Sequence, residues 1–268
     1  MRRKCIGETI FLEEHSLDFE LHGNCIAIKL ENCAAVLPGT HVEEVSGQIQ
    51  ILVPTVGSVH RFVFPHPSRI RSRVIGASQP SIFANITDSR QCHATFSLLS
   101  DVTAVPQCAA SVVCPGSAEA LFAIGCSDGS VVVISLPAVG RSGEPSQDIL
   151  RSGSTVQRIS SWLSKPFSRD DANGDLVCDV AIQILEKDIY VYGLSANCRL
   201  QVWSCKKKQE VKSLNVTDYI PFVTPEEVLL RKDLCFSHKV RLSKVNKNVF
   251  LVLFIPAADK AKVLPFNI

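Results

Sequence analysis

The alternation of apolar and polar positions predicts four β-hairpins along the chain. Residues 48–65, 120–137 and 188–205 each consist of an apolar stretch, a four-residue turn and a second apolar stretch. Residues 249–268 repeat this pattern with a longer turn. Short apolar runs on either side of a turn are typical of buried strands that are joined in a hairpin.

The turns of the first three hairpins share a residue type at their third position. This position holds Gly57, Gly129 and Asn197 in turn. Glycine and asparagine are the residues that adopt a positive φ most readily. We therefore predict that these three are structural turn residues with positive φ.

The phase of the second strand also agrees among the four hairpins. Positions three, five and seven residues beyond the turn residue share one face, because side chains alternate along a strand with a period of two. We expect this face to point mostly inward. Counted from Gly57, Gly129, Asn197 and Ala261, these positions are His60, Phe62 and Phe64; Val132, Ile134 and Leu136; Leu200, Val202 and Ser204; and Leu264, Phe266 and Ile268.

The spacing of the hairpins favours a β-propeller. The turn positions are 72, 68 and 64 residues apart (129 − 57, 197 − 129 and 261 − 197), longer than the ~40–45 residues of a compact blade but compatible with inserted segments. Two such segments, 154–164 and 224–234, have the pattern of short helices. We predict a mainly β chain that forms a partial β-propeller of about four decorated blades with short inserted helices. A β-sandwich is the alternative.

Four residues are candidates for packing between blades or for an interface. His60, Phe62 and Phe64 lie on the inward face, where His60 is expected to be a satisfied core or interface histidine and not a base. Trp203 lies in the opposite phase and is expected to fill a gap between neighbouring blades. Binding of a partner by Trp203 is the alternative.

The fourth hairpin runs to Ile268, whereas a propeller normally closes on itself and so protects its edge strands. We therefore expect residues 1–268 to be an incomplete front part of a larger protein. A small four-bladed ring is the alternative.

Composition and charge limit the classes of partner. Of the 268 residues, 46% are hydrophobic and 20% charged, which is enough apolar material for a packed core. The formal net charge of +2 is too small for the basic field of a nucleic-acid-binding protein. The basic run at 206–208 is expected to be a solvated turn. The longest apolar stretch, 248–258, is too short to span a bilayer, so we expect neither direct nucleic-acid contact nor membrane insertion.

Catalytic and metal-binding signatures are missing from the sequence. It contains no nucleophile elbow, zinc-protease motif or phosphate-binding loop. The eleven cysteines, odd in number and irregular in spacing, indicate reduced thiols and not disulfides. His66, between two prolines, is expected to be a surface or packing residue, and 170–175 an acidic loop and not a calcium site. We expect no enzymatic activity, no cofactor, no metal and no small-molecule substrate.

An ordered series of short segments resembles one protein family. The segments are EHSLD (14–18), NCAAVLPG (32–39), VHRFVFPHPSR (59–69), SIF (81–83), EALFAIGCSDGSVVVISLP (119–137), VQRISSW (156–162), RLQVWS (199–204) and HKVRL (238–242). Together they resemble the N-terminal β-propeller of the 160-kDa nucleoporin family, a scaffold of the Y-shaped subcomplex of the nuclear pore. The resemblance covers nearly the whole chain and lies in the order of the series, not in any single motif.

The resemblance implies a noncatalytic scaffold of the nuclear pore complex in the nuclear envelope. It implies contacts with other Y-complex nucleoporins and a part in nucleocytoplasmic transport, including mRNA export and protein import. The family's C-terminal α-solenoid, which makes the contacts at the hub of the Y, is absent from residues 1–268; a truncated gene model or a short isoform is another explanation of this absence.

A WD-type propeller adaptor, such as a substrate receptor of a ubiquitin ligase, is the alternative function. A hydrolase built on a propeller would need a repeated set of convergent carboxylate, His or Ser side chains, which the sequence lacks.

Overall fold

The structure, a computed structural model, describes the chain in segments that fall into two compact units. The described residues are 2–6, 9–14, 26–30, 35–69, 83, 92–98, 104–152, 176–185, 188–219, 238–245, 248–255 and 260–265. Unit 1 comprises residues 1–99, 111–120 and 135–145, and unit 2 comprises residues 100–110, 121–134 and 146–268.

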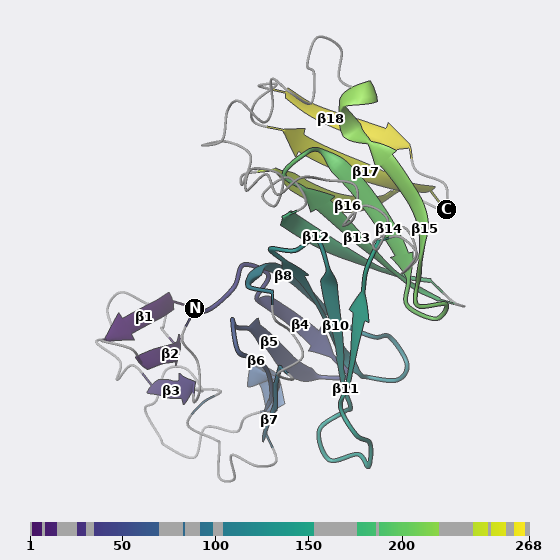
Figure 1. Cartoon of the computed structure of the whole chain (residues 1–268). Coiled ribbons are helices and arrows are strands. Elements are labelled where there is room, and N and C mark those ends of the chain that lie inside the picture. Colours follow the sequence, from purple (N-terminus) through teal and green to yellow (C-terminus); the bar gives the residue numbers. More distant parts are fainter. Residues whose placement is uncertain are drawn as a thin grey trace. The chain divides into compact units, whose positions relative to one another are not determined.

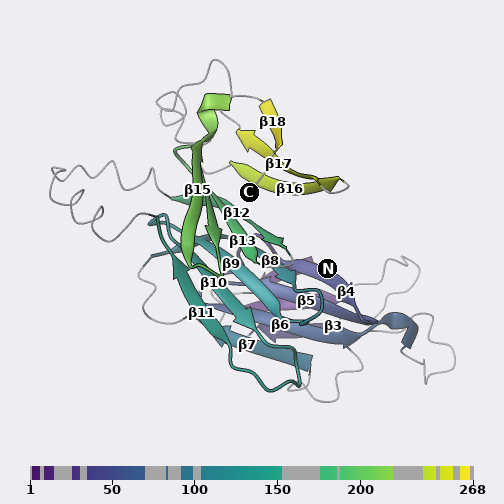
Figure 2. The same cartoon turned by 90° about the vertical axis from the view of Figure 1, so that its right-hand side faces the viewer.

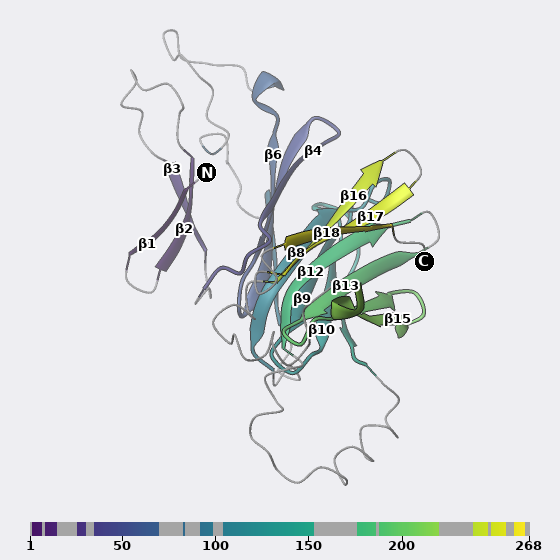
Figure 3. The ribbon, with the colours of Figure 1, turned by 90° about the horizontal axis from the view of Figure 1, so that it is seen from above.

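Consecutive strands lie side by side in five sheets across the described residues (Figure 1), and Figures 2 and 3 show the same sheets from two other directions. The first two sheets are β1 (Arg2–Ile6), β2 (Thr9–Glu14) and β3 (Ile26–Leu30), then β4 (His41–Val45), β5 (Gln48–Pro54), β6 (Ser58–Pro65) and β7 (His93–Ser97). The third is β8 (Pro106–Val113), β9 (Ala120–Cys126), β10 (Val131–Leu136) and β11 (Ser146–Leu150). The last two are β12 (Val177–Ile184), β13 (Ile189–Ser195), β14 (Arg199–Ser204) and β15 (Gln209–Asn215), then β16 (Lys239–Val245), β17 (Asn248–Ile255) and β18 (Lys260–Pro265). Short 3-10 helices, η1 (Pro67–Arg69) and η3 (Val216–Tyr219), follow β6 and β15.

All four predicted hairpins are present, as β5–β6, β9–β10, β13–β14 and β17–β18. In the first, Ile51 lies opposite Phe62, and in the last, Leu251 lies opposite Leu264. The prediction of a mainly β chain is confirmed. The β1–β3 sheet was not predicted, because the charged residues of Arg2–Ile6 interrupt the apolar pattern that a half-buried strand would show.

Some predictions concern parts of the chain outside the described residues. These are the helices at 154–164 and 224–234, the acidic loop at 170–175, and the strand positions Phe266 and Ile268.

The prediction of positive φ holds at one of the three turn residues. Gly129 has a φ of 82°. At the third hairpin the prediction is wrong by one residue, because Cys198 and not Asn197 has positive φ, at 62°. Gly57 lies in its turn but does not have positive φ.

The Gly57 turn is closed by side chains instead. Thr55 Oγ1 accepts a hydrogen bond from the Ser58 backbone N–H at 2.9 Å and donates to the Ser58 carbonyl at 2.8 Å. Hydroxyl side chains commonly close turns in this way, so the backbone needs no left-handed residue here.

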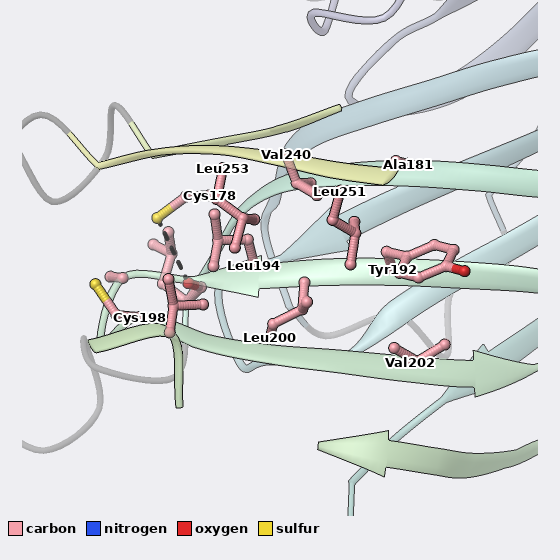
Figure 4. Packing of buried hydrophobic residues seen from close by; sticks show 13 residues of the cluster. Cys178, Ala181, Tyr192, Leu194, Cys198, Leu200, Val202, Val240, Leu251 and Leu253 are labelled. Carbon is pink, nitrogen blue, oxygen red and sulfur yellow. Dashed lines mark hydrogen bonds between the residues drawn. The ribbon is translucent and has the colours of Figure 1, made fainter. Parts of the chain in front are cut away.

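One face of the β12–β15 sheet is apolar and is covered by the β16–β18 sheet. Leu200 and Val202 of β14 belong to one buried cluster with Leu251 and Leu253 of β17. Figure 4 shows these side chains in the space between the two sheets. The predicted inward phase of β14 thus matches a real contact between neighbouring sheets in unit 2.

The opposite face of the β12–β15 sheet is covered as well. Fully buried Trp203 belongs to a cluster with Val131 of β10 and Val177 of β12. Gly193 of β13 leaves room for the indole ring, since a Cβ at this position would lie 2.9 Å from Trp203 Cζ3. Because both faces are covered, β13 and β14 are buried along almost their whole length and lack a clean alternation of buried and exposed positions.

A buried carboxylate also joins β12 to β16. Asp179, whose side chain is 4% exposed, accepts a hydrogen bond from the Val240 backbone N–H at 3.0 Å and forms an ion pair with Arg241 at 2.5 Å. Hydrogen bonds that involve a charged group are stronger and more directional than neutral ones. Asp179 therefore fixes the position of one sheet on the other within unit 2.

In unit 1 the β1–β3 sheet packs on the β4–β7 sheet. Leu12 and Leu30, from β2 and β3, share a buried cluster with Ile51, Phe62 and Phe64. The rings of Phe62 and Phe64 stack with their centroids 6.1 Å apart. The phase predicted for β6 thus coincides with the face that this small sheet covers.

We predict that Trp203→Ala lowers the free energy of unfolding by about 3–5 kcal/mol, because it opens a cavity between two sheets. Urea denaturation followed by far-ultraviolet circular dichroism measures the change. Val211→Ala on the exposed side of β15 is the control, with an expected effect within about 0.5 kcal/mol. Equal losses for the two variants would contradict the packing role of Trp203.

Candidate functional site

The candidate residues from the sequence lie in the interior. His60, Phe62 and Phe64 are each 1% exposed, and Trp203 is fully buried. A residue that binds a partner has to be accessible to it. In the described structure these four side chains contribute to packing and present no surface for binding.

His60 is the middle member of a buried hydrogen-bond chain. Its Nε2 lies 2.9 Å from Ser58 Oγ, and its Nδ1 lies 3.1 Å from His93 Nε2. Burial, together with the neighbouring His93, lowers the pKa of His60 to about 4. His60 is therefore neutral at pH 7, with one ring nitrogen donating and the other accepting. Since Ser58 is itself 1% exposed, this Ser–His pair is closed to a substrate.

Arg61, on the opposite face of β6, is the most unusual side chain of unit 1. It is 1% exposed. Its Nε and Nη2 donate to Gln50 Oε1 at 3.1 and 2.7 Å, and Nη2 also donates to the Ala118 carbonyl at 2.6 Å. Its Nη1 donates to the carbonyls of Leu136 at 3.5 Å and Pro137 at 2.8 Å. The guanidinium thus connects two strands of the β4–β7 sheet to two other segments of the same unit.

The charge of Arg61 has no anionic partner within the described residues, where all its acceptors are neutral oxygens. Burial lowers the pKa of Arg61 from its ordinary value, while Cys114 acts in the opposite sense. A guanidinium remains protonated in proteins even so. The structure therefore holds a positive charge in its interior.

A cavity of about 250 Å³ lies beside Arg61. Valine and alanine side chains form part of its wall. The polar residues that line it are Ser46, Gln48, Gln50, Arg61 and Arg141. Two of these five are cationic and none is acidic, so the cavity suits an anionic group.

The basic run at 206–208 forms the exposed turn between β14 and β15, as the sequence predicts. Lys208 forms an ion pair with Asp148 at 2.5 Å. The turn is held by Asp188, whose carboxylate accepts a hydrogen bond from the Lys206 backbone N–H at 3.0 Å. Burial raises the pKa of Asp188, but hydrogen bonds led by that from Ser204 outweigh this effect and lower the pKa overall. This network stabilises the turn between the two strands.

His66 is half-buried, and its Nδ1 lies 2.7 Å from Ser68 Oγ. Its Nε2 lies 3.6 Å from Glu44 Oε2. These contacts fit a residue that orders the end of β6.

The seven cysteines whose side chains the structure describes form no disulfide, and five of the seven are buried. Burial raises the pKa of Cys114 and of Cys126 to about 11, and raises that of Cys108 further. Thiols are nucleophilic and bind metals as thiolates, so these groups are poor candidates for either role at neutral pH.

Two kinds of feature are missing from the described residues. They contain no cluster of three or more His, Cys, Asp or Glu side chains arranged to hold a metal ion. No helix among them is long and apolar enough to cross a membrane.

Sequence reasoning missed Arg61, although a signal was present. Gln50 and Arg61 are polar residues inside β5 and β6, two strands in which most residues are apolar. In the hairpin register Gln50 lies opposite Val63, two residues from Arg61, so the two polar side chains share a face. Polar groups on one buried face have to find partners, which predicts a contact between them. The carbonyl acceptors lie 57 to 76 residues further along the chain and have no local sequence signal.

Comparison with known proteins assigns the family. The family model for the nucleoporin Nup120/160 β-propeller domain matches residues 6–266. The chain belongs to this nucleoporin family. The resemblance seen in the sequence is therefore confirmed, and the repeated antiparallel sheets belong to a β-propeller domain and not to a β-sandwich.

Curated relatives agree with the nucleoporin assignment. The chain is 30% identical to nuclear pore complex protein Nup160 of Homo sapiens over 280 residues, which cover 99% of this chain and 19% of that protein. The Mus musculus protein is 29% identical over 99% of this chain and 19% of its own length. The Drosophila melanogaster homologue is 23% identical over 96% of this chain and 18% of its own length. The chain thus spans about a fifth of the length of these relatives.

Among solved structures, that of AztD from Citrobacter koseri aligns with 98% of this chain and 55% of its own, at 8% identity and a TM-score of 0.42. The nucleoporin assignment does not depend on it.

We predict that Arg61→Met destabilises the chain by about 3 kcal/mol, because it leaves several buried acceptors without a donor. Arg61→Lys should also destabilise it, since an ammonium group lacks the planar fork that reaches these acceptors together. Urea denaturation measures both changes. Arg141→Met is the control, because Arg141 is exposed and its effect should lie within about 0.5 kcal/mol. A stable Arg61→Met variant would show that the buried cation is dispensable.

The lowered pKa of His60 predicts a loss of stability in mild acid. The unfolded chain binds a proton at His60 near pH 6.5, while the folded chain resists protonation down to about pH 4. The stabilisation from neutral His60 is thus complete above pH 6.5 and declines as the pH falls towards 4, by about 3 kcal/mol in total. Urea midpoints measured across this range should fall less steeply for His60→Gln than for the parent chain. If the urea midpoints of His60→Gln and of the parent chain fall equally with pH, His60 is not the cause of the loss of stability.

Proposed function

We propose that this chain is a structural scaffold component of the nuclear pore complex. The family match over residues 6–266 is the observation that carries the proposal. The three curated relatives carry names that place them in the nuclear pore complex. Because the chain spans about a fifth of their length, their role is extended to it as an inference.

The interior of the described sheets supports a noncatalytic role. The Ser58–His60 pair is buried, and burial raises the pKa of Cys108, Cys114 and Cys126, which lowers the reactivity of these thiols. Stacked sheets with buried polar connections provide rigidity, which is what a scaffold requires. We propose that the chain acts without catalysis, cofactor or small-molecule substrate.

The proposed partners are other nucleoporins of the Y-shaped subcomplex, and the proposed location is the nuclear pore in the nuclear envelope. We propose residues 1–268 as the N-terminal β-propeller portion of such a nucleoporin, with the α-solenoid outside this stretch of sequence. The role would support mRNA export and protein import through pore assembly. The ordered resemblance to a Y-complex member, the family match and the succession of sheets support this assignment. A WD-type adaptor of a ubiquitin ligase is the alternative that the experiment has to distinguish.

We predict that the tagged chain, expressed in cells, gives a rim at the nuclear envelope and purifies with Y-complex nucleoporins. Fluorescence microscopy and mass spectrometry of the purified material measure the two outcomes. The Trp203→Ala variant is a useful control, because loss of sheet packing should reduce both signals together. Recovery of cullin-type ligase subunits in place of nucleoporins would contradict the scaffold proposal.

A further inference from the structure

The cavity beside Arg61 has a positive charge that the described residues leave unbalanced. Arg61 makes no ion pair there, and its acceptors are one amide oxygen and three carbonyls. Buried cations in proteins are normally paired with an anion, because desolvating a lone charge is costly. Arg141 adds a second positive charge to the lining. It is exposed, and its side chain makes no hydrogen bond or ion pair within the described part of the chain.

The carboxylates closest in sequence to the lining residues do not cancel this charge. Glu43 Oε2 lies 3.3 Å from His41 Nε2, and Glu44 Oε2 lies 3.6 Å from His66 Nε2. Neither glutamate lines the cavity. Glu119, next to Ala118, is exposed and is also outside the lining. The residues that line the cavity therefore carry a net positive charge, from Arg61 and Arg141.

The size and wall of the cavity indicate how large an anionic group it suits. At about 250 Å³ it is smaller than the ~300–1,000 Å³ pockets that hold drug-sized molecules. Val45, Val63 and Val139 provide apolar wall, while Ser46 and Gln48 provide polar side chains. A ligand that fits this lining has a short apolar stem and a carboxylate at its end.

We propose that this cavity binds a glutamate side chain from an acidic segment of a partner protein. The two methylene groups of the glutamate would pack on the valines, and its carboxylate would pair with Arg141 and accept a hydrogen bond from Ser46. All five N–H groups of Arg61 are engaged, so Arg61 contributes charge and not a direct hydrogen bond. Burial strengthens this contribution, because water screens a charge less in the interior than at the surface.

The inference rests on the proposed scaffold role and adds one contact to it. Arg61 holds the cavity in shape through its bonds to Ala118, Leu136 and Pro137, and Arg141 at the lining remains available to a partner. The same buried cation would then stabilise the unit and attract its ligand.

The test uses the full 268-residue chain and a fluorescein-labelled Gly-Ser peptide with several glutamates, titrated by fluorescence anisotropy. A peptide with glutamine in place of every glutamate is the matched ligand. Arg141→Glu reverses the exposed charge at the cavity. Lys207→Glu makes the same reversal on the exposed turn at 206–208, which is the rival basic site. Circular dichroism melts of both variants confirm that each is folded.

We expect saturable binding of the glutamate peptide that weakens by about tenfold or more in Arg141→Glu and by less than about twofold in Lys207→Glu. The glutamine peptide should bind about tenfold or more weakly. Loss of binding in Lys207→Glu but not in Arg141→Glu would overturn the proposal, as would absence of saturable binding. Displacement of the peptide by inorganic phosphate at equal concentration would also overturn it, since phosphate lacks the apolar stem. Failure here leaves the rim staining and nucleoporin recovery unaffected, so it is distinguishable from failure of the scaffold role.

Discussion

The structure depends on sheets that are apolar on both faces. In the β12–β15 sheet, Leu200 and Val202 face the next sheet along the chain, while Trp203 faces the preceding one. A single sheet of this kind cannot bury itself, so its stability comes from its two neighbours. The local hairpins form from nearby residues, but the sheets gain most of their stability only when they are stacked.

Apolar packing is not directional, and a few buried polar groups supply the missing geometry. Asp179 fixes β12 to β16 through the backbone of Val240 and the side chain of Arg241. Arg61 does the same in unit 1 through carbonyl groups. The two differ in charge balance: Asp179 has a cationic partner, whereas Arg61 has only neutral ones within the described residues. A scaffold benefits from both kinds of contact, because its partners need surfaces that hold their shape.

Much of this fold could be predicted from the sequence, and the failures have physical reasons. The hairpins and their phase follow from a period of two, which is a local property of each strand. The φ values of the turn residues were harder to predict. The side chains of Thr55 and Ser58 close the turn at Gly57 without a positive φ, and in the third hairpin Cys198, not Asn197, has the positive φ. The cavity and the Arg61 network could not be predicted as a whole, since Arg61 meets carbonyls up to 76 residues away. Backbone carbonyls occur at every residue, so the sequence does not mark which of them an arginine will reach.

The buried cysteines determine how the folded protein responds to oxidants and alkylating reagents. Cys108, Cys114 and Cys126 are thiols whose raised pKa and burial keep them protonated and shielded from solvent. Oxidants and alkylating reagents attack the thiolate, so these cysteines react slowly with both while the sheets remain packed together. Separation of the sheets exposes sulfur, and the rate of alkylation then reports how often they open. The chain has eleven cysteines, so alkylation of its natural thiols can report opening of the sheets without an introduced probe.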